Sequence, residues 1–487
     1  MEPPGGHPKW SRKEFYLAFS SGDLGLQSIL SHILSETLVH VIETQETYLY
    51  NAVTRLWEFK EEKEMPTYCA KILVDTIKPL LSLKQYEATL LPIHGKLTSV
   101  KSCVKLWDEV KYSFKRANFK SKLNAAPYLI PMADGTVVDI LTMKVRDRRP
   151  DDLFTKAYPC VLLPESASVS EIEKFALELS NGDAELAVFL SKYVGYLLSG
   201  LTNWKSIFIL LGKSNGGKTT LLKLIQAMMG DFWSTVNSSV VLATSQSKEN
   251  PTGPTPQFLP LQSCRAVFYS EPAVGSRLNA ATLKAISGDG THIRCRLPYS
   301  RQELSFAPIA KLSYDSNPVL ITDDEALLRR LLIIPFLATF VFEPKAPHEY
   351  LADPDRIAKL INEHLNEAFT WAIRGIHSML SSGKGLQAHL PKVVRTATAR
   401  YQQLQIPEEC YINECIEVID EHDDDMLSEK TLLRHFNKWC RTNGLPVNDK
   451  IYQTNLINHL IELTNRVVTV GKNKQERERL FGVRIKA

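Results

Sequence analysis

The segment Gly212–Thr219 has the sequence GKSNGGKT and fits the pattern G-x-x-x-x-G-K-[ST]. Its glycines let the backbone N–H groups point at phosphate oxygens, and the start of the following helix adds positive potential. Lys218 can reach the β- and γ-phosphates, and the Thr219 hydroxyl can bind Mg²⁺. The pattern therefore predicts a site for a nucleoside triphosphate, taken here as ATP, together with Mg²⁺. The residues predicted to bind this cofactor are Gly212, Lys213, Ser214, Asn215, Gly216, Gly217, Lys218, Thr219 and Thr220.

Two polar residues follow short apolar segments further along the chain. Glu271 comes after Ala266–Tyr269, where an acid at a strand end could activate water and bind the metal. Asn317 comes after Lys311–Tyr314, where an amide can sense the γ-phosphate, although Asn-Pro is also a common turn. The catalytic candidates here are Lys218, Glu271 and Asn317, and the predicted metal ligands are Thr219 and Glu271.

An arginine pair, Arg329 and Arg330, precedes the apolar run Leu331–Phe336. An arginine in this position could reach a nucleotide bound to a neighbouring subunit, an effect worth about 10³–10⁵ in turnover. It could equally be an ordinary arginine at a helix end. Both residues are kept as catalytic candidates.

A cluster of cations around one aromatic ring could contact nucleic acid. Such a cluster suits phosphate contacts combined with a single stacked base. An exposed basic hairpin with a structural tyrosine is the alternative. The predicted DNA-binding residues are Lys284, His292, Arg294, Arg296, Tyr299 and Arg301.

These residues need a strand, a loop and a helix to position them. Ile207–Leu211 has the continuous apolar pattern of a buried strand. Thr219–Met229 has apolar residues at helical spacing and is followed by Gly230, a common helix terminator. From residue 207 to 336, short apolar strands alternate with loops rich in Gly, Asn and Pro. We therefore expect an α/β nucleotide-binding core in this part of the chain.

The motifs of this core also resemble a known family. GKSNGGKT, FYSEP, LKAISGDGTHIRCRLPY, KLSYDSNP and LLRRLLIIPF occur in the order found in superfamily 3 helicases, and most resemble the poxvirus and phage/plasmid primase-helicase branch. Asn124–Tyr158 is similar to the segment that precedes the ATPase core in that branch. Two departures are Gly216, where the family usually has Asn, and the stretch CRLPYS, which is less typical.

The resemblance implies an AAA+-like P-loop NTPase core that forms a hexameric ring and moves 3′ to 5′ on single-stranded DNA. It implies that Lys218, Thr219 and Glu271 serve ATP hydrolysis, that Asn317 is the sensor, and that Arg330, with Arg329 beside it, acts between subunits. Lys284, Gly288, Asp289 and Arg294 match the stretch leading into a DNA-contacting hairpin.

The regions before the core are predicted to mix helices with short strands. Tyr48–Tyr50 and Arg55–Trp57 indicate a hairpin, and 128–150 indicates short strands around a turn at Asp134-Gly135. Glu171–Leu198 has the spacing of one amphipathic helix. The basic run Lys111–Lys122 is either a solvated helix face, which we favour, or a nucleic-acid contact.

The C-terminal region indicates a winged-helix domain. Apolar residues at helical spacing predict helices over Glu429–Arg441 and from Asp449 onward. Val467–Val470 and Leu480–Ile485 predict two strands around a basic loop. The basic tail could contact duplex DNA, which we favour, or a partner protein.

Composition sets the broad limits. The 487 residues include 58 Lys+Arg and 54 Asp+Glu, a net charge of +4, with 44% hydrophobic residues, which is typical of an ordinary globular protein. Eight cysteines without a CxxC pair favour free thiols in a reducing compartment. No apolar run is long enough for a membrane span, so we expect no membrane partner.

Together these patterns predict an ATP-dependent DNA helicase of viral or mobile-element replication, a homo-oligomer acting on single-stranded DNA and replication forks at intracellular sites. A separate primase or polymerase is a possible partner. The alternatives are an ATP-switched DNA-binding initiator without unwinding activity and an unrelated nucleotide enzyme such as a small-molecule kinase. The expected domains are a mixed α/β region at 1–165, a helical collar at 166–200, the ATPase core at 201–345, a helical extension at 346–404 and the winged helix at 405–487.

Overall fold

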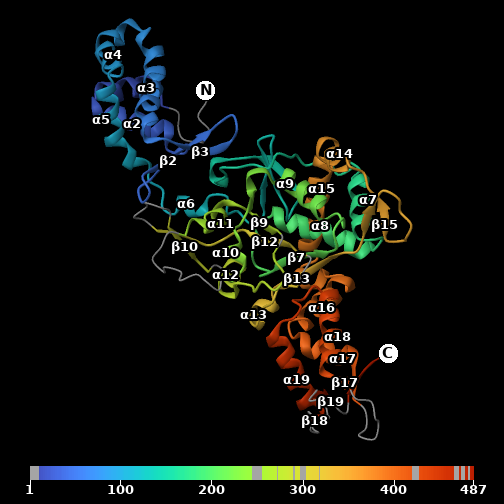
Figure 1. The fold of residues 1–487 in the computed structure, drawn as a ribbon. Coiled ribbons are helices and arrows are strands. Elements are labelled where there is room, and N and C mark those ends of the chain that lie inside the picture. The colour runs from blue at the N-terminus through green and yellow to red at the C-terminus, as the bar shows by residue number, and fades with distance from the viewer. Residues whose placement is uncertain are drawn as a thin grey trace. The chain divides into compact units, whose positions relative to one another are not determined.

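The computed structural model describes residues 10–486 apart from gaps at 244–254, 271, 289–290, 297–302, 317–318, 419–426, 465–470, 473–477 and 481–482. The chain divides into two compact units (Figure 1). The first contains Met1–Asp139 and Met143–Tyr158, and the second contains Ile140–Thr142 and Pro159–Ala487. The finer, five-part division expected from the sequence stays a prediction.

The first unit opens with helices around an apolar core. α1 begins at a capping box, in which Ser11 Oγ accepts from the Glu14 N–H at 3.3 Å and the Glu14 carboxylate accepts from the Ser11 N–H at 2.5 Å. Leu30, Leu73 and Trp107 lie on different helices and are almost fully buried. The helices are α1 (Arg12–Ser20), α2 (Asp23–Leu34), α3 (Met65–Leu81), α4 (Lys84–Lys96), α5 (Val100–Val110) and α6 (Phe119–Lys122).

Two small antiparallel sheets complete this unit. The predicted hairpin is confirmed: its turn is fixed by Asn51 Oδ1, which accepts from the N–H groups of Val53 at 2.8 Å and Thr54 at 3.2 Å. The turn at Asp134-Gly135 is also confirmed, and Gly135 adopts φ +81° there. The strands are β1 (Leu38–Val41), β2 (Glu46–Asn51), β3 (Leu56–Lys60), β4 (Leu129–Pro131), β5 (Thr136–Asp139) and β6 (Lys144–Asp147).

The basic run of the first unit is not a solvated helix face. It forms a short 3₁₀ turn, Lys111–Phe114, and α6. Lys111 lies 3.0 Å from both Glu62 and Asp108, and Arg116 lies 3.7 Å from Asp151. Lys120 lies 2.8 Å from Glu46. Acidic residues from other parts of this unit therefore neutralise much of the run.

A five-stranded parallel sheet with the order β13-β7-β12-β9-β8 forms the centre of the second unit (Figure 1). β7 and β12 lie inside the sheet and have nearly continuous buried residues, as expected for strands covered on both faces. The predicted α/β architecture with a parallel sheet is confirmed. The strands are β7 (Ile207–Gly212), β8 (Trp233–Thr235), β9 (Ala266–Ser270), β12 (Lys311–Ser316) and β13 (Leu331–Phe336).

The single helix predicted over Glu171–Leu198 is wrong. The structure has two helices, α7 (Ser170–Leu179) and α8 (Ala184–Leu198). Asn181 and Gly182 between them adopt φ +50° and +82°, which no helix continues through, and the Asp183 side chain then caps α8 by accepting from Leu186 N–H at 3.0 Å.

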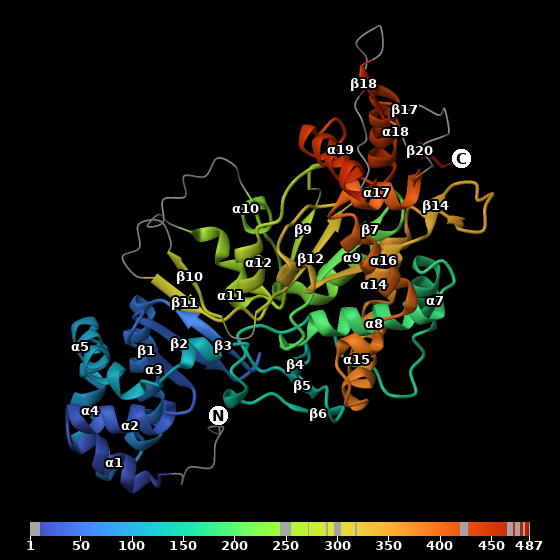
Figure 2. The same cartoon turned by 90° about the horizontal axis from the view of Figure 1, so that it is seen from below.

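α8 packs beneath the sheet beside α15 (Leu365–Ser381), as Figure 2 shows. Tyr193 of α8 donates to Ser313 Oγ of β12 at 2.9 Å. At the C-terminal end of α8, buried Arg265 and Lys311 donate to the carbonyl oxygens of Leu198 and Ser199. Burial, and secondarily the nearby Arg265, lowers the pKa of Lys311 well below its usual value. These bonds fix α8 against the amino ends of β9 and β12.

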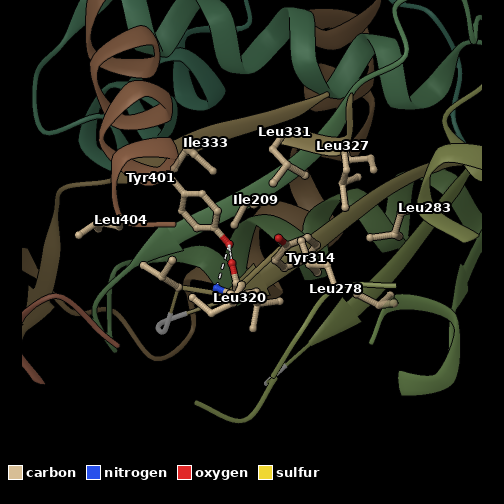
Figure 3. Close-up of a cluster of buried hydrophobic side chains, with 14 of the residues drawn as sticks. Ile209, Leu278, Leu283, Tyr314, Leu320, Leu327, Leu331, Ile333, Tyr401 and Leu404 are labelled. Atoms are coloured by element: carbon tan, nitrogen blue, oxygen red, sulfur yellow. Dashed lines mark hydrogen bonds between the residues drawn. The ribbon is translucent and has the colours of Figure 1, made fainter. Parts of the chain in front are cut away.

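The segment after β12 is fixed by α16 (Lys392–Gln403) (Figure 3). Tyr401 Oη accepts from the Leu320 N–H at 2.9 Å and donates to the Leu320 carbonyl at 3.1 Å. Gln405 Oε1 accepts from the Thr322 N–H at 2.9 Å. The chain leaving the sheet beside the candidate residue Asn317 is therefore held in place by a helix that lies about 80 residues later.

Smaller helices and strands surround the sheet. Within the helical extension expected at 346–404, α14 (Arg356–Glu363) and α15 are separated at His364. The remaining elements before the C-terminal region are α9 (Lys218–Met229), α10 (Ser238–Val241), α11 (Pro260–Ser263), α12 (Ala280–Ile286), α13 (Glu325–Leu328), β10 (Ile293–Arg296), β11 (Glu303–Phe306), β14 (Thr339–Val341) and β15 (Glu349–Leu351).

The described residues of the C-terminal region form three helices and short strands. The two predicted helices are α18 (Glu429–Thr442) and α19 (Lys450–Thr464), and α17 (Pro407–Cys415) precedes them. The strand expected over Leu480–Ile485 is wrong as one element, since its two ends pair with different partners. Val467–Val470 lies outside the described residues. The strands are β16 (Ile416–Val418), β17 (Leu427–Ser428), β18 (Gly471–Lys472), β19 (Glu478–Leu480) and β20 (Val483–Ile485).

Among the described residues, no helix has the length and apolar character needed to span a bilayer. All eight cysteines are free thiols.

Candidate functional site

The loop between β7 and α9 has the backbone conformation that its glycines predicted. Gly217 ends the loop at φ +81°, and Asn215 adopts φ +60°. A side chain at Gly217 would lie 2.4 Å from Leu179 Cδ2 and 2.9 Å from Phe340 Cε2. Glycine is therefore required at this position both by the backbone angle and by close packing.

Lys218 lies in the first turn of α9 with its ammonium turned into the loop. Its side chain is 7% exposed and lies 3.6 Å from Asp315 Oδ1. The ammonium donates to the carbonyl oxygens of Gly212 and of Lys213, the latter at 3.0 Å. A phosphate oxygen could replace these acceptors without any movement of the backbone, since the lysine is already positioned at the loop.

The loop forms one wall of a cavity of about 780 Å³. Thr219 and Thr220 line it at the start of α9, and Asp315 lines it at the end of β12. The opposite walls come from segments far apart in the sequence. Lining residues that the sequence analysis did not select are Phe175, Pro272, Asp315, Phe340, Phe342, Ala352, Asp353, Pro354, Arg356 and Ile357.

Two of these missed residues form a fixed wall. The Arg356 guanidinium lies 4.9 Å from the centre of the Phe175 ring and 2.5 Å from Glu178 Oε2. Phe175 is 2% exposed and also lines the cavity. A cation stacked on a buried ring and paired with an acid is well ordered, which suits a wall that positions a ligand.

Phe342 is different, because it is 77% exposed although it is large and apolar. It lines the same cavity as Ile357 and Phe340. An exposed aromatic ring at the rim of a polar cavity gives a flat apolar surface that a planar ligand group can cover.

Asp315 could have been found from the sequence. It stands two residues before Asn317, at the end of a strand that pairs directly with β7, where Asp315 faces Leu210. An acid at this edge, beside the loop lysine, is a common metal or water ligand. Of the run Asp315-Ser316-Asn317, only Asn317 was predicted from the sequence to belong to the site.

Glu271 and Asn317 lie outside the described residues. The strands that precede them, β9 and β12, are neighbours in the sheet, and their ends pair as Asp315 with Ser270. β12 in turn pairs with β7. The carboxyl ends of these three parallel strands therefore share the sheet edge at which the β7–α9 loop begins.

The donor set of this edge fits Mg²⁺. A hydroxyl at Thr219 and a carboxylate at Asp315 are oxygen ligands of the kind that Mg²⁺ prefers, and both line the cavity. Among the described residues, no group of three or more His, Cys, Asp or Glu side chains could hold a metal without a substrate. Mg²⁺ commonly uses one or two protein oxygens and completes its shell with phosphates and water.

Neither Arg329 nor Arg330 lines the cavity. Arg330 donates to the Lys284 carbonyl at 2.8 Å and to Ser287 Oγ at 3.0 Å, which satisfies the C-terminal end of α12. Arg329 is exposed and pairs with Glu325 at 3.0 Å. Of the two arginines, Arg329 is the one whose side chain projects into solvent.

Of the predicted DNA-binding cations, Lys284 lies on α12, and Arg294 and Arg296 lie on β10, which pairs antiparallel with β11. Arg294 is exposed, whereas Ile293 and Cys295 on either side of it are buried. Lys284 lies 2.5 Å from Asp324, and its hydrogen bond lowers the pKa of that carboxyl. His292 and Arg296 belong to the same hairpin, and Tyr299 and Arg301 lie outside the described residues.

Comparison with known proteins adds to this geometry. Residues 27–180 match a family model described as D5 N terminal like. The chain is 24% identical over 322 residues to a protein of Acanthamoeba polyphaga mimivirus provisionally named helicase L207/L206, covering 65% of this chain and 31% of the relative. It is 27% identical over 201 residues to a protein of Sputnik virophage provisionally named helicase V13, covering 40% of this chain and 25% of the relative. The chain thus spans less than a third of the length of these relatives.

Among solved structures, the apo C-terminal region of NrS-1 aligns with a TM-score of 0.40 at 10% identity, covering 94% of this chain and 99% of that one. A second apo structure of that region aligns with a TM-score of 0.40 at 11% identity, covering 95% and 99%. Residues 27–180 are thus similar to the D5 N terminal like family, and the chain is similar to viral proteins provisionally named helicases, as its motifs predicted.

Proposed function

We propose that this chain is an ATP-dependent DNA helicase that acts in the replication of viral or mobile-element DNA, as a hexameric ring on single-stranded DNA. The observation that carries the proposal is the buried ammonium of Lys218, which lies between loop carbonyls and Asp315 at a cavity formed by the β7–α9 loop. The D5 N-terminal-like match and the two viral relatives support the same function.

In this proposal the Gly212–Thr219 segment is the phosphate-binding loop of an AAA+-like core. Its backbone N–H groups and the start of α9 bind the phosphates of ATP, and Lys218 exchanges its carbonyl acceptors for phosphate oxygens. Thr219 and Asp315, with Glu271 following β9, would hold Mg²⁺. Bound Mg²⁺ would neutralise charge on the transferred phosphoryl group.

Further roles follow from the positions of the neighbouring residues. Glu271 would orient the attacking water, and Asn317 would respond to the γ-phosphate. Arg329 or Arg330 would complete the site of a neighbouring subunit. The cations of the β10–β11 hairpin would contact the phosphates of the translocated strand.

We extend the proposal to where the protein acts and what it acts with. The two viral relatives support an action at intracellular sites of viral DNA replication, where replication forks would be the substrate and a primase or polymerase would be a partner. The C-terminal helices and strands would form a winged-helix domain.

The decisive experiment measures steady-state ATP turnover with and without single-stranded DNA, together with strand displacement, for the wild type and Lys218→Ala. Loss of Lys218 removes the charge that the phosphates require, so turnover should fall at least ~100-fold, about 3 kcal/mol in the barrier. Lys223→Ala is the matched control, because Lys223 is an exposed lysine on the same helix.

Two outcomes would contradict the proposed helicase function. Wild-type turnover that DNA does not stimulate, without strand displacement, would favour an ATP-switched initiator. Nucleotide consumption that depends on an added small acceptor would favour a kinase-type enzyme.

A further inference from the structure

We propose that a groove along the exposed basic face of α18 binds the sugar-phosphate backbone of duplex DNA. We call it the α18 groove. The groove is a second cavity, of about 920 Å³, in the C-terminal region and away from the nucleotide site. This inference rests on the proposed function only in taking DNA as the ligand, and it does not depend on helicase activity. The groove is lined by Glu429, Lys430, Thr431, Leu433, Arg434, His435, Asn437, Lys438, Arg441, Asn448, Gln453 and Ile485.

The cations of the groove form a single stripe. Lys430, Arg434, Lys438 and Arg441 follow each other at intervals of four, four and three residues, which places them on one face of the helix. Their Cα atoms span about 16 Å along the helix axis, at ~1.5 Å per residue. Duplex DNA presents about one negative charge per 1.7 Å of its axis, so a stripe of this length meets several phosphates.

The opposite face of α18 anchors the helix. Leu432, Phe436 and Cys440 are almost fully buried. Ser428 caps the helix by accepting from the Thr431 N–H at 3.2 Å, and Trp439 Nε1 donates to Glu414 Oε2 at 2.9 Å. Because the core holds α18 firmly, the cations are presented on a rigid support rather than on a mobile tail.

Within the residues that the structure describes, the cations of the groove are not paired with acids. All four Lys and Arg side chains are exposed, and none has an ion-pair partner within the described part of the chain. Glu429 is the one acid in the lining. His435 is engaged with Tyr411, whose Oη lies 2.9 Å from His435 Nδ1. The remaining polar lining residues, Asn437, Asn448 and Gln453, are suited to hydrogen bonds with phosphate and sugar.

The lining favours duplex DNA over single strands. Proteins that bind single strands combine cations with aromatic rings on which bases stack. The lining of the α18 groove contains no Phe, Tyr or Trp. Cations and amides without a stacking surface suit the backbone of a duplex, whose bases are already stacked.

The test is fluorescence anisotropy of a labelled DNA duplex with the full chain, without nucleotide, comparing Arg434→Gln/Lys438→Gln with the wild type. We expect duplex affinity to fall on the order of 10-fold in low salt, equally for unrelated sequences. The slope of log affinity against log salt should decrease by about 2, since each lost phosphate contact contributes ~0.9. The matched control is Lys392→Gln/Arg395→Gln, which removes one Lys and one Arg that are exposed on α16.

The control should bind duplex like the wild type, and all three proteins should unfold at the same temperature and hydrolyse ATP equally without DNA. Equal duplex affinity of the α18 variant and the control would overturn the proposal, as would a greater loss for single-stranded DNA than for duplex. An unchanged salt slope would also contradict it. If Lys218→Ala did not lower ATP turnover, the proposed helicase function would be contradicted. The expected loss of duplex affinity in the α18 variant would be unaffected.

Discussion

The cavity at the β7–α9 loop and the α18 groove present positive charge in opposite ways. Lys218 is nearly buried and already holds three acceptors, two loop carbonyls and Asp315. The four cations of the α18 groove are exposed and extend into solvent. A buried cation in a shaped cavity can select one small ligand, whereas an exposed stripe can accept any polyanion of suitable spacing.

The physical basis of this difference is the surrounding medium. Around Lys218 little water screens the charge, so an added phosphate would interact strongly and at defined distances. Along α18, water and salt screen each cation, and at ~0.15 M salt the interaction decays over about 8 Å. Affinity at α18 must therefore come from several weak contacts made together.

The largest effect should come from disturbing the shape of the cavity. Gly217→Ala places a methyl group in contact with Leu179 and Phe340 at a residue with φ +81°. We expect a loss of about 1–3 kcal/mol in the free energy of unfolding and more than 10-fold lower ATP turnover, measured by thermal denaturation and steady-state kinetics.

Gly182→Ala is the matched control for this change. Its φ of +82° is the same, but no atom lies within 4 Å of the added methyl group, so it tests backbone strain alone. For Gly182→Ala we expect a loss of about 1 kcal/mol in the free energy of unfolding and unchanged ATP turnover. If both variants lose the same stability and activity, packing around Gly217 does not shape the cavity.

An intermediate effect is expected at the rim of the cavity. Phe342 is 77% exposed and offers a ring that the base of a nucleotide could cover. Phe342→Ala should raise KM for ATP about 5-fold and leave kcat unchanged, because one aromatic contact is worth about 1 kcal/mol. Val188→Ala, an exposed apolar residue on α8, is the control. A fall in kcat at constant KM would show that Phe342 does not contact the bound base.

The smallest effect should come from the basic run Lys111–Lys122, whose cations are largely paired. Lys120→Gln removes a partner of Glu46 and should lower stability by less than about 1 kcal/mol, with duplex affinity unchanged. Lys122→Gln, an exposed position in the same short helix, is the comparison. If Lys120→Gln lowered duplex affinity as much as the α18 variant does, paired and unpaired basic segments would not differ in DNA binding.

Sequence reasoning succeeded where structure is local. The order of strand, glycine loop and helix around Lys218 follows from neighbouring residues, and so do the turns at Asn51 and Gly135. The break between α7 and α8 was missed although Asn181-Gly182 is itself a turn dipeptide. The helical spacing of apolar residues on both sides concealed this signal.

What the sequence alone determined is the loop that forms one wall of the cavity, because its glycine turns and the lysine that faces into it are encoded within eight consecutive residues, Gly212–Thr219. Only the tertiary structure decided the walls, because Phe175, Asp315, Phe342 and Arg356 come from separate segments. It also decided which basic segments remain available. Lys120 is neutralised by an acid 74 residues away, whereas none of the described acids pairs with the four cations of the α18 groove. Charge pairing depends on distance in space, which the order of residues along the chain does not fix.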